Sequence, residues 1–300
     1  MQFQVSLFQG DPRLDGQDHL SPPPFRMQLL KWVGSKQRVG HVIASYFPAD
    51  YRTYFEPFLG SAGVLGVIAP HTAVGSDAFA PLIGIWHCLH DDPALLVEWY
   101  RERWEQFVTA ADPVDAYEAI KASYNARPNA ADLLFLSRSC YGGVVRFRKD
   151  GYMSTPCGVH RPVSPASFKS RVAEWARRTV GTRFLRLDYR EAIDLAGEGD
   201  VVYCDPPYSD TQAILYGAQA FALPDLLEHI GAAKDRGAKI ALSIDGTKKS
   251  RRHTVELPIP DGLFAREVFV NCGVSQLRRF QCRNETLGDE MVADRLLLTW

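Results

Sequence analysis

The stretch Asp200-Val201-Val202-Tyr203-Cys204-Asp205-Pro206-Pro207-Tyr208 carries most of the information about the fold. Its first half is a short apolar run with β-branched residues, which is typical of a strand buried in a parallel sheet. Its second half begins with an acid and two prolines, and proline ends a central strand because it has no N–H to donate. Ligands of open α/β sheets bind at the carboxyl ends of strands. We therefore predict a functional site directly after Cys204.

The four residues Asp205, Pro206, Pro207 and Tyr208 suit the handling of a planar amine. An aromatic amine is a poor nucleophile, and a carboxylate followed by a proline-fixed carbonyl offers two acceptors for its two hydrogens. Tyr208 adds a face on which a base can stack. We predict that these four residues are catalytic and act on the exocyclic amine of a nucleobase. The alternative is a Pro-Pro turn in which Asp205 is only a cap.

Other segments predict further strands, and helical segments lie between them. An α/β fold with a mostly parallel sheet follows from this alternation. The expected strands are 54–59, 73–77, 184–187, 201–204, 239–244, 267–270 and 296–298, and a helix is expected over 64–69.

A glycine turn follows the first expected strand. Gly60 and Gly63 allow the backbone to approach a ligand closely, and Asp77 ends the next strand, where sheets of this type place a carboxylate on a ribose hydroxyl. The dinucleotide pattern GxGxxG is not present, and Glu56 precedes the turn. A cationic sulfonium cofactor with an amino group suits such a turn better than a pyrophosphate does. An ordinary strand-to-helix turn, or a dinucleotide-dependent oxidoreductase, is the alternative.

Composition predicts a globular protein. The chain has 300 residues, of which 46% are hydrophobic, and a net charge of −1, which suits one large domain or a core domain with an insert. No run of about eighteen apolar residues and no basic, then apolar, leader occurs, so we expect a cytoplasmic protein with no membrane segment. The six cysteines include no CxxC pair, and His87, Cys88 and His90 would point in different directions on a helix. We predict no metal site.

Positive charge is concentrated in one part of this neutral chain. Between Arg138 and Arg190 there are twelve Lys or Arg residues and three acids, and a second basic cluster occupies 248–253. Such an excess predicts contact with the phosphates of a nucleic acid. Some of these side chains could instead simply solvate helix faces.

The chain divides into three expected parts. Several prolines and glycines in residues 1–26 indicate a flexible extension that adds nothing to the core. We expect deletion of these residues to be tolerated. Residues 27–78 and 181–300 would form the catalytic domain. Residues 79–180 would form a target-recognition insert, helical to about 138 and then a β-hairpin or irregular loop over 141–158.

Four blocks, with the similarity spanning roughly 27–300, resemble the Dam-like DNA adenine methylases: Leu30 to Lys36, Phe55 to Gly63 together with Ser76-Asp77, Asp205 to Tyr208, and Leu136 to Gly158. The resemblance implies a Rossmann-like class I S-adenosylmethionine-dependent methyltransferase sheet with an inserted DNA-recognition domain. Asp188-Tyr189 looks like the family segment that borders the adenine ring of the cofactor. The implied S-adenosylmethionine site consists of Trp32, Lys36, Glu56, Phe58, Gly60, Gly63, Asp77 and Asp188.

The segment from Leu136 to Gly158 resembles the DNA-recognition hairpin of that family, in which a Tyr wedges into the duplex and an Arg reads a guanine. Ser137 and Gly142 stand where family members often have Asn, so a GATC target is not carried over to this chain. The implied DNA-binding residues are Arg138, Tyr141, Arg146, Arg148, Lys149, Lys248 and Lys249.

The expected reaction is transfer of a methyl group from S-adenosylmethionine to N6 of an adenine flipped out of double-stranded DNA. The resemblance implies a monomer and leaves open a cognate restriction endonuclease as partner. Methylation of cytosine N4, methylation of adenine in RNA, and a non-catalytic DNA-binding relative are the alternatives; Asp205, rather than Ser, at the first motif position favours adenine.

Overall fold

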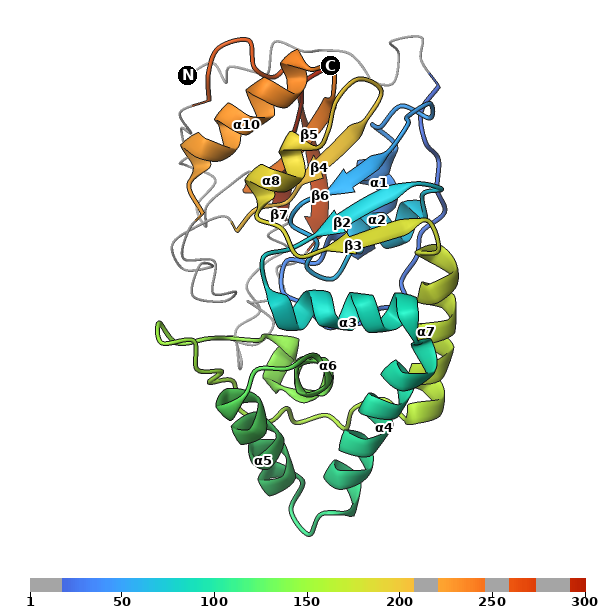
Figure 1. The fold of residues 1–300 in the computed structure, drawn as a ribbon, viewed down its shortest axis with the longest axis vertical. Coiled ribbons are helices and arrows are strands. Elements are labelled where there is room, and N and C mark those ends of the chain that lie inside the picture. The colour runs from blue at the N-terminus through green and yellow to red at the C-terminus, as the bar shows by residue number, and fades with distance from the viewer. Residues whose placement is uncertain (1–17, 208–220, 246–258, 274–291) are drawn as a thin grey trace.

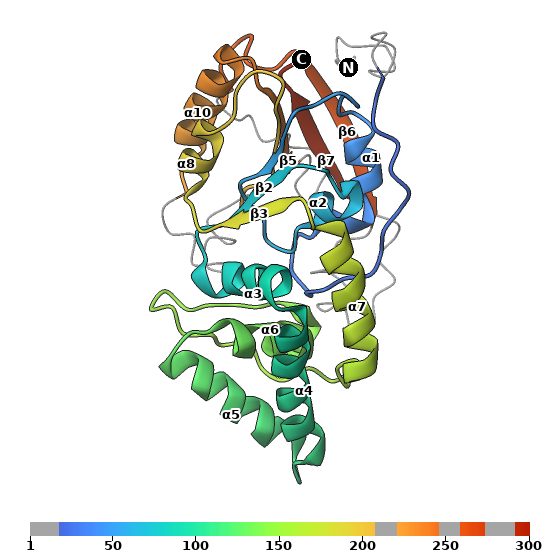
Figure 2. The ribbon, with the colours of Figure 1, turned by 45° about the vertical axis from the view of Figure 1, so that its right-hand side comes forward.

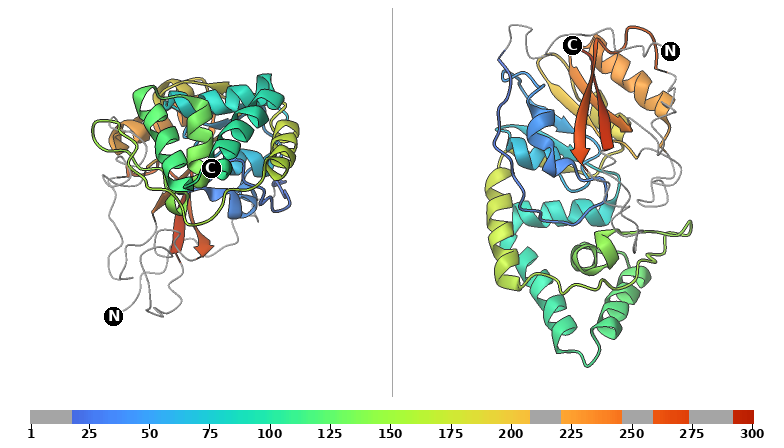
Figure 3. Two further views of the ribbon diagram at one scale, coloured as in Figure 1. Left: turned by 90° about the horizontal axis from the view of Figure 1, so that it is seen from below. Right: turned by 180° about the vertical axis from the view of Figure 1, so that it is seen from behind.

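The computed structural model describes residues 18–207, 221–245, 259–273 and 292–300. A seven-stranded sheet in the order β3-β2-β1-β4-β5-β7-β6 forms its centre (Figure 1). Five strands are parallel, and β7 and β6 form an antiparallel pair at one edge, seen from behind in Figure 3. The strands are β1 (Tyr54–Glu56), β2 (Ala73–Ser76), β3 (Thr182–Leu185), β4 (Val201–Cys204), β5 (Lys239–Asp245), β6 (Arg266–Gly273) and β7 (Val292–Leu298).

The order of the strands creates a switch point between β1 and β4. From β1 the chain proceeds through β2 to β3 in one direction, and it then returns to place β4 on the other side of β1. At such a point the connections leave in opposite directions, which opens a crevice outside the carboxyl ends of the two strands. Glu56 ends β1 and Asp205 follows β4, so both lie at this crevice.

Two cores cover the two faces of the sheet. Neighbouring residues of a strand point to opposite faces, so Tyr54 and Tyr203 enter one core while Phe55 and Cys204 enter the other. The helices α8 (Tyr189–Asp194) and α10 (Leu223–Asp235) cover one face, and α1 (Gly40–Ala44) and α2 (Gly63–Ile68) lie on the other (Figure 2).

Five further helices form a layer beside the sheet (Figure 1). Three of them begin with a capping side chain followed by proline at the first helical position: Asp92 before α4, Asp112 before α5 and Ser164 before α7. The helices are α3 (Ala80–Asp91), α4 (Pro93–Thr109), α5 (Pro113–Ala126), α6 (Ala130–Ser139) and α7 (Pro165–Arg178). In the described part of the chain, no helix has the length and apolarity needed to cross a membrane.

This helical layer shares one core with the sheet. Trp86 of α3 stacks on Phe184 of β3 with ring centroids 5.4 Å apart, and it also contacts Trp175 of α7 at 5.3 Å. All three side chains belong to the cluster that contains Tyr54 and Tyr203. The helical layer is therefore packed as a continuation of the core on this face of the sheet.

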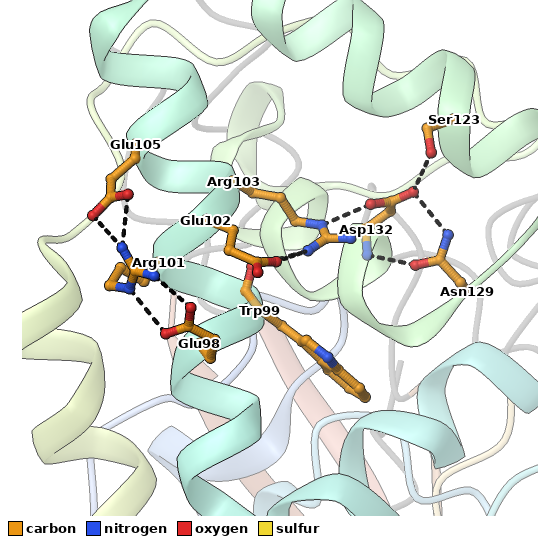
Figure 4. A network of polar contacts seen from close by, with 9 residues as sticks. All are labelled: Glu98, Trp99, Arg101, Glu102, Arg103, Glu105, Ser123, Asn129 and Asp132. Carbon is orange, nitrogen blue, oxygen red and sulfur yellow. Dashed lines mark hydrogen bonds and ion pairs between the residues drawn. The ribbon is translucent and has the colours of Figure 1, made fainter.

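A buried carboxylate joins three helices of the layer (Figure 4). Asp132 of α6 accepts hydrogen bonds from Arg103 Nε of α4 (2.6 Å) and from Ser123 Oγ of α5 (2.8 Å). Asn129, the N-cap of α6, also donates to Asp132 (2.7 Å). Because α6 leads directly into the 140–158 segment, this network fixes the base from which that segment extends.

The prediction that residues 1–26 add nothing to the core is wrong for residues 18–26. Phe25 is only 7% exposed and meets Trp175 edge to face at 5.4 Å. Arg178 also lies over the Phe25 ring, with its guanidinium carbon 3.9 Å from the ring centroid. Proline-rich sequence removes helical and strand periodicity, but an extended segment can still bury a single aromatic ring. Residues 1–17 lie outside the described part.

The expected β-hairpin or irregular loop at 141–158 has no regular strands, but isolated bridges fold the 140–158 segment back on itself as an irregular hairpin. Isolated bridges join Cys140 to Cys157 and Phe147 to Met153. Gly142 and Gly143 both have φ of 66°, which turns the chain just after Tyr141. The segment projects from the helical layer in both Figure 1 and Figure 2.

Candidate active site

A cavity of about 350 Å³ opens at the switch point, at the carboxyl ends of β1, β2 and β4. Its volume is within the range of small-molecule sites. Seven of the eight predicted cofactor residues line it, and so do three of the four predicted catalytic residues. These are Trp32, Lys36, Glu56, Phe58, Gly60, Gly63 and Asp77, with Asp205, Pro206 and Pro207. Tyr208 lies outside the described residues.

The turn that contains Gly60 and Gly63 packs directly against residues 32–37 in the wall of the cavity. A Cβ on Gly63 would lie 2.8 Å from the backbone N of Gln37, and a Cβ on Gly60 would lie 3.3 Å from the Trp32 ring. Gly60 also has a positive φ of 48°, a conformation that glycine adopts at little cost. Close approach therefore requires a glycine at position 63, and the positive φ favours one at position 60, so the turn can pack against Trp32 and Gln37 in one wall of the cavity.

Glu56 is held in the floor of the cavity. It is 3% exposed and accepts hydrogen bonds from the Tyr54 hydroxyl (2.7 Å) and from the backbone N–H of Leu65 (2.8 Å). Burial raises the pKa of Glu56 to about 8, although these hydrogen bonds act in the opposite direction. A cation in the cavity would favour the ionised form of this carboxyl group.

Asp77 is oriented by backbone N–H groups. One carboxylate oxygen accepts from Gly60 (3.1 Å) and the other from Phe79 (3.0 Å). Burial raises the pKa of Asp77 despite these bonds. Each carboxylate oxygen has two lone pairs, so Asp77 can also accept a hydrogen bond from a ligand hydroxyl.

Asp205 is in contact with Lys36, and a second carboxylate approaches the same lysine. Lys36 Nζ lies 2.9 Å from Asp205 Oδ1 and 3.4 Å from Asp294 Oδ2. Burial opposes the charged form of Lys36, but the attraction of Asp205 and Asp294 outweighs it and raises the pKa of the lysine. Sequence reasoning missed Asp294, which belongs to no motif that we identified.

The composition of the cavity fits S-adenosylmethionine. Among the described residues, three acids, Glu56, Asp77 and Asp205, line it, and the one lysine, Lys36, is engaged by two carboxylates. This charge pattern suits a sulfonium and an ammonium group, whereas a pyrophosphate would meet like charges. Trp32, Phe58 and Phe79 supply aromatic surface for a nucleoside.

Asp188 is not among the described residues that line the cavity, and its cofactor role stays a prediction. Its side chain caps α8 by accepting from the backbone N–H of Arg190 (3.0 Å), in a capping box with Glu191. Aspartate before a helix is common for this reason alone. Its neighbour Tyr189 does approach the site, because it stacks on Phe58 at 5.2 Å.

The predicted DNA-binding residues separate into two groups. The prediction that Arg138 binds DNA is wrong, because its side chain is buried. Arg138 is 4% exposed and donates to the carbonyls of Gln28 (3.1 Å) and Leu29 (2.8 Å), so it ties α6 to the segment just before Leu30. A sequence count of basic residues cannot separate such a buried arginine from a surface one. The exposed group comprises Tyr141, Arg146, Arg148 and Lys149. Lys248 and Lys249 lie outside the described residues.

Alternation along the hairpin explains the exposure of Arg146 and Arg148. Val145 and Phe147 are buried, whereas Arg146 and Arg148 between and after them are exposed. Arg148 lies over the Tyr152 ring, 5.1 Å from its centroid, and pairs with Asp150 (2.8 Å). The apolar residues thus anchor the hairpin to the helical layer, and its basic side chains face outwards.

An open α/β sheet with an acid-lined cavity at its switch point has the architecture of α/β proteins that bind a ligand at the carboxyl ends of their strands. The family model described as D12 class N6 adenine-specific DNA methyltransferase matches residues 32–257, and the chain belongs to this family. The predicted resemblance to Dam-like DNA adenine methylases and the predicted Rossmann-like methyltransferase fold are confirmed.

Three relatives illustrate the similarity. A DNA N-6-adenine-methyltransferase of Escherichia phage P1 is 26% identical over 276 residues, which cover 88% of this chain and 34% of the relative. The Retron Ec67 DNA adenine methylase of Escherichia coli is 29% identical, covering 61% of this chain and 64% of the relative. A DNA adenine methylase of Vibrio cholerae is 27% identical, covering 75% and 83%. The chain thus spans about a third of the phage P1 relative and under two thirds of the Ec67 relative.

Proposed function

We propose that this chain transfers a methyl group from S-adenosylmethionine to N6 of an adenine flipped out of double-stranded DNA. The observation that carries the proposal is that Asp205-Pro206-Pro207 and seven of the eight predicted cofactor residues line one cavity. S-adenosylmethionine supplies the methyl group. The protein supplies the binding, orientation and electrostatic environment.

The cofactor would be held by the acids of the cavity. Asp77, already oriented by two backbone N–H groups, would accept a ribose hydroxyl. Glu56 would neutralise positive charge from the floor of the cavity. Phe58 and Trp32 would enclose the apolar part of the nucleoside.

The target amine would be held by two acceptors. The Asp205 carboxylate and the Pro206 carbonyl would each accept one hydrogen of the amine, which directs the nitrogen lone pair towards the methyl group. Alignment and placement of charge would provide most of the acceleration. Tyr208 would provide the stacking face for the base.

The duplex would be positioned by the 140–158 hairpin. Arg148 and Lys149 would contact phosphates, as would Lys248 and Lys249, and these contacts carry no sequence information. Tyr141 would wedge into the duplex and Arg146 would read a base, while flipping the adenine would cost a few kcal/mol.

We further propose a cytoplasmic monomer. One relative, from Lactococcus lactis, is named a Type II methyltransferase, which favours a cognate restriction endonuclease as a partner.

Modified-base mapping tests this proposal. DNA from a methylation-free host that expresses the chain would be compared with DNA from a host that expresses Asp205→Ala. We expect N6-methyladenine within one short motif only with the unaltered chain. Folded protein that binds S-adenosylmethionine but leaves DNA unmodified would refute the proposal, and methylated RNA in the same cells would identify the alternative substrate.

A further inference from the structure

The antiparallel strand β7 brings a carboxylate to the active site from near the end of the chain. Asp294 lies opposite Asp245 of β5 and Val270 of β6 in the sheet register. Because β7 runs against β5, its first residues lie at the edge where β4 and β5 end. Asp294 therefore lies at the same edge as Asp205, which follows β4.

Asp294 and Asp205 converge on one buried ammonium group. The side chains of Lys36, Asp205 and Asp294 are 8%, 18% and 10% exposed, and Lys36 Nζ lies within 3.4 Å of both acids. Such poorly hydrated charges interact more strongly than surface pairs, and a change at one of them is felt by the other two. Lys36 also lies 3.4 Å from the carbonyl of Gly34, which holds its ammonium at the wall of the cavity.

This arrangement leaves Lys36 unsuited to accept a proton from the methylated amine, because the two acids raise its pKa. What Lys36 can still do is attract the Asp205 carboxylate and fix its orientation. Asp205 must present a carboxylate to the target amine while it stays in contact with Lys36, and a carboxylate has lone pairs for both partners. The lysine can orient Asp205 only if the lysine itself is held from another side.

We propose that Asp294 is a positioning residue for methyl transfer: its carboxylate holds the Lys36 ammonium, and Lys36 in turn orients the Asp205 carboxylate towards the target amine. This inference rests on the proposed function. It assigns a role in the site to β7, which lies beyond all four sequence blocks and beyond the 32–257 region that the family model matches.

The first test compares Asp294→Asn with Asp294→Glu, and Glu267→Gln is the matched control. Glu267 pairs with Arg295 (2.6 Å), which is next to Asp294 on β7 and therefore points to the opposite face of the sheet. We expect Asp294→Asn to lower the single-turnover rate by about tenfold or more, because a small misplacement of a reacting group is costly. We expect the Kd for S-adenosylmethionine to change by less than about threefold, Asp294→Glu to recover most of the rate, and Glu267→Gln to have no effect on it.

The second test reads the contact without the reaction. Lysines would be acetylated with a trace of acetic anhydride, and modification of Lys36 would be quantified by mass spectrometry relative to the exposed Lys31. Loss of Asp294 charge should increase Lys36 modification several-fold, because it makes deprotonation easier. Glu267→Gln should leave the ratio unchanged.

The outcomes separate this inference from the proposed function. An Asp294→Asn variant with the unaltered rate, or with unaltered Lys36 modification, would overturn the positioning role while the unaltered chain still methylates DNA. An equal loss of rate in Glu267→Gln would also overturn it, because the effect would then be general to the strand pair. An unaltered chain that binds S-adenosylmethionine without methylating DNA would instead remove the proposed function.

Discussion

Gly66 of α2 and Trp175 of α7 approach each other so closely that no side chain fits between them. A Cβ on Gly66 would lie 2.4 Å from the Trp175 ring, and Arg178 on the same helix donates to the Gly66 carbonyl (3.0 Å). Trp175 also contacts Phe25 and Trp86. This contact joins the helix after the glycine turn to the helical layer that carries the 140–158 segment.

Gly66→Ala should therefore destabilise the protein, although alanine favours helices. Displacing the buried Trp175 ring would cost about 1–3 kcal/mol. Gly231→Ala in α10 is the matched control, because the nearest atom to its Cβ is 3.7 Å away, and there alanine should stabilise by about 0.5–1 kcal/mol. Urea unfolding of both variants measures this. Equal stability of the two would contradict the close contact.

Phe25→Ala should lower the stability of the protein, because residues 18–26 contribute to the core through this ring. The ring is buried in contact with Trp175 and Arg178, and removing such a side chain costs about 3–5 kcal/mol. Pro24→Ala, at an exposed neighbouring position, should have little effect. Thermal unfolding of both variants provides the comparison. A Phe25→Ala protein as stable as the unaltered one would show that residues 18–26 do not contribute to the stability of the core.

Asp132→Ala should loosen the helical layer beneath the hairpin. It leaves the charge of Arg103 without its buried partner, and breaking a buried pair in this way costs about 3–5 kcal/mol. Glu105→Gln, which removes an exposed partner of Arg101, should change stability little. We would follow hydrogen exchange of residues 130–158 by mass spectrometry. Unchanged exchange in Asp132→Ala would show that the network does not fix the hairpin.

Glu56 should link cofactor binding to pH. Its pKa of about 8 means that most molecules carry a protonated Glu56 at neutral pH. A cationic cofactor favours the carboxylate and therefore lowers this pKa, so binding should release a proton and strengthen as pH rises towards 8. Titration calorimetry in two buffers of different ionisation enthalpy measures the released proton. Glu56→Gln should release none, and an equal release by both proteins would assign the proton to another group.

Arg146 and Lys149 should differ in how they affect DNA binding. Arg146→Ala should reduce discrimination at one base pair by about 1–3 kcal/mol, because a base-reading contact is lost. Lys149→Ala should weaken binding to all sequences and reduce the slope of log K against log salt by about 1. Fluorescence anisotropy over a series of salt concentrations and single-base variants of the target separates the two. Identical profiles would mean that Arg146 is also only a phosphate contact.

Local sequence signals predicted the framework of the protein. The strand at 201–204 and the turn after Glu56 follow from side-chain pattern, proline and glycine, which act within a few residues. Glu56, Asp77 and Asp205 then fall at one edge because parallel strands end at the same side of a sheet. For these residues, pattern and topology are sufficient, so the sequence by itself determined the fold class and most of the cavity.

Tertiary structure alone decided which side chains are buried and which distant ones meet. Arg138 and Arg146 are eight positions apart and both basic, yet the interior carbonyls of Gln28 and Leu29 bind one and the hairpin exposes the other. Asp294 reaches Lys36 only because β7 inserts antiparallel between β5 and β6. The physical reason is that a local pattern specifies the conformation of its own segment, whereas burial and ion pairing depend on partners that only the packed chain brings together.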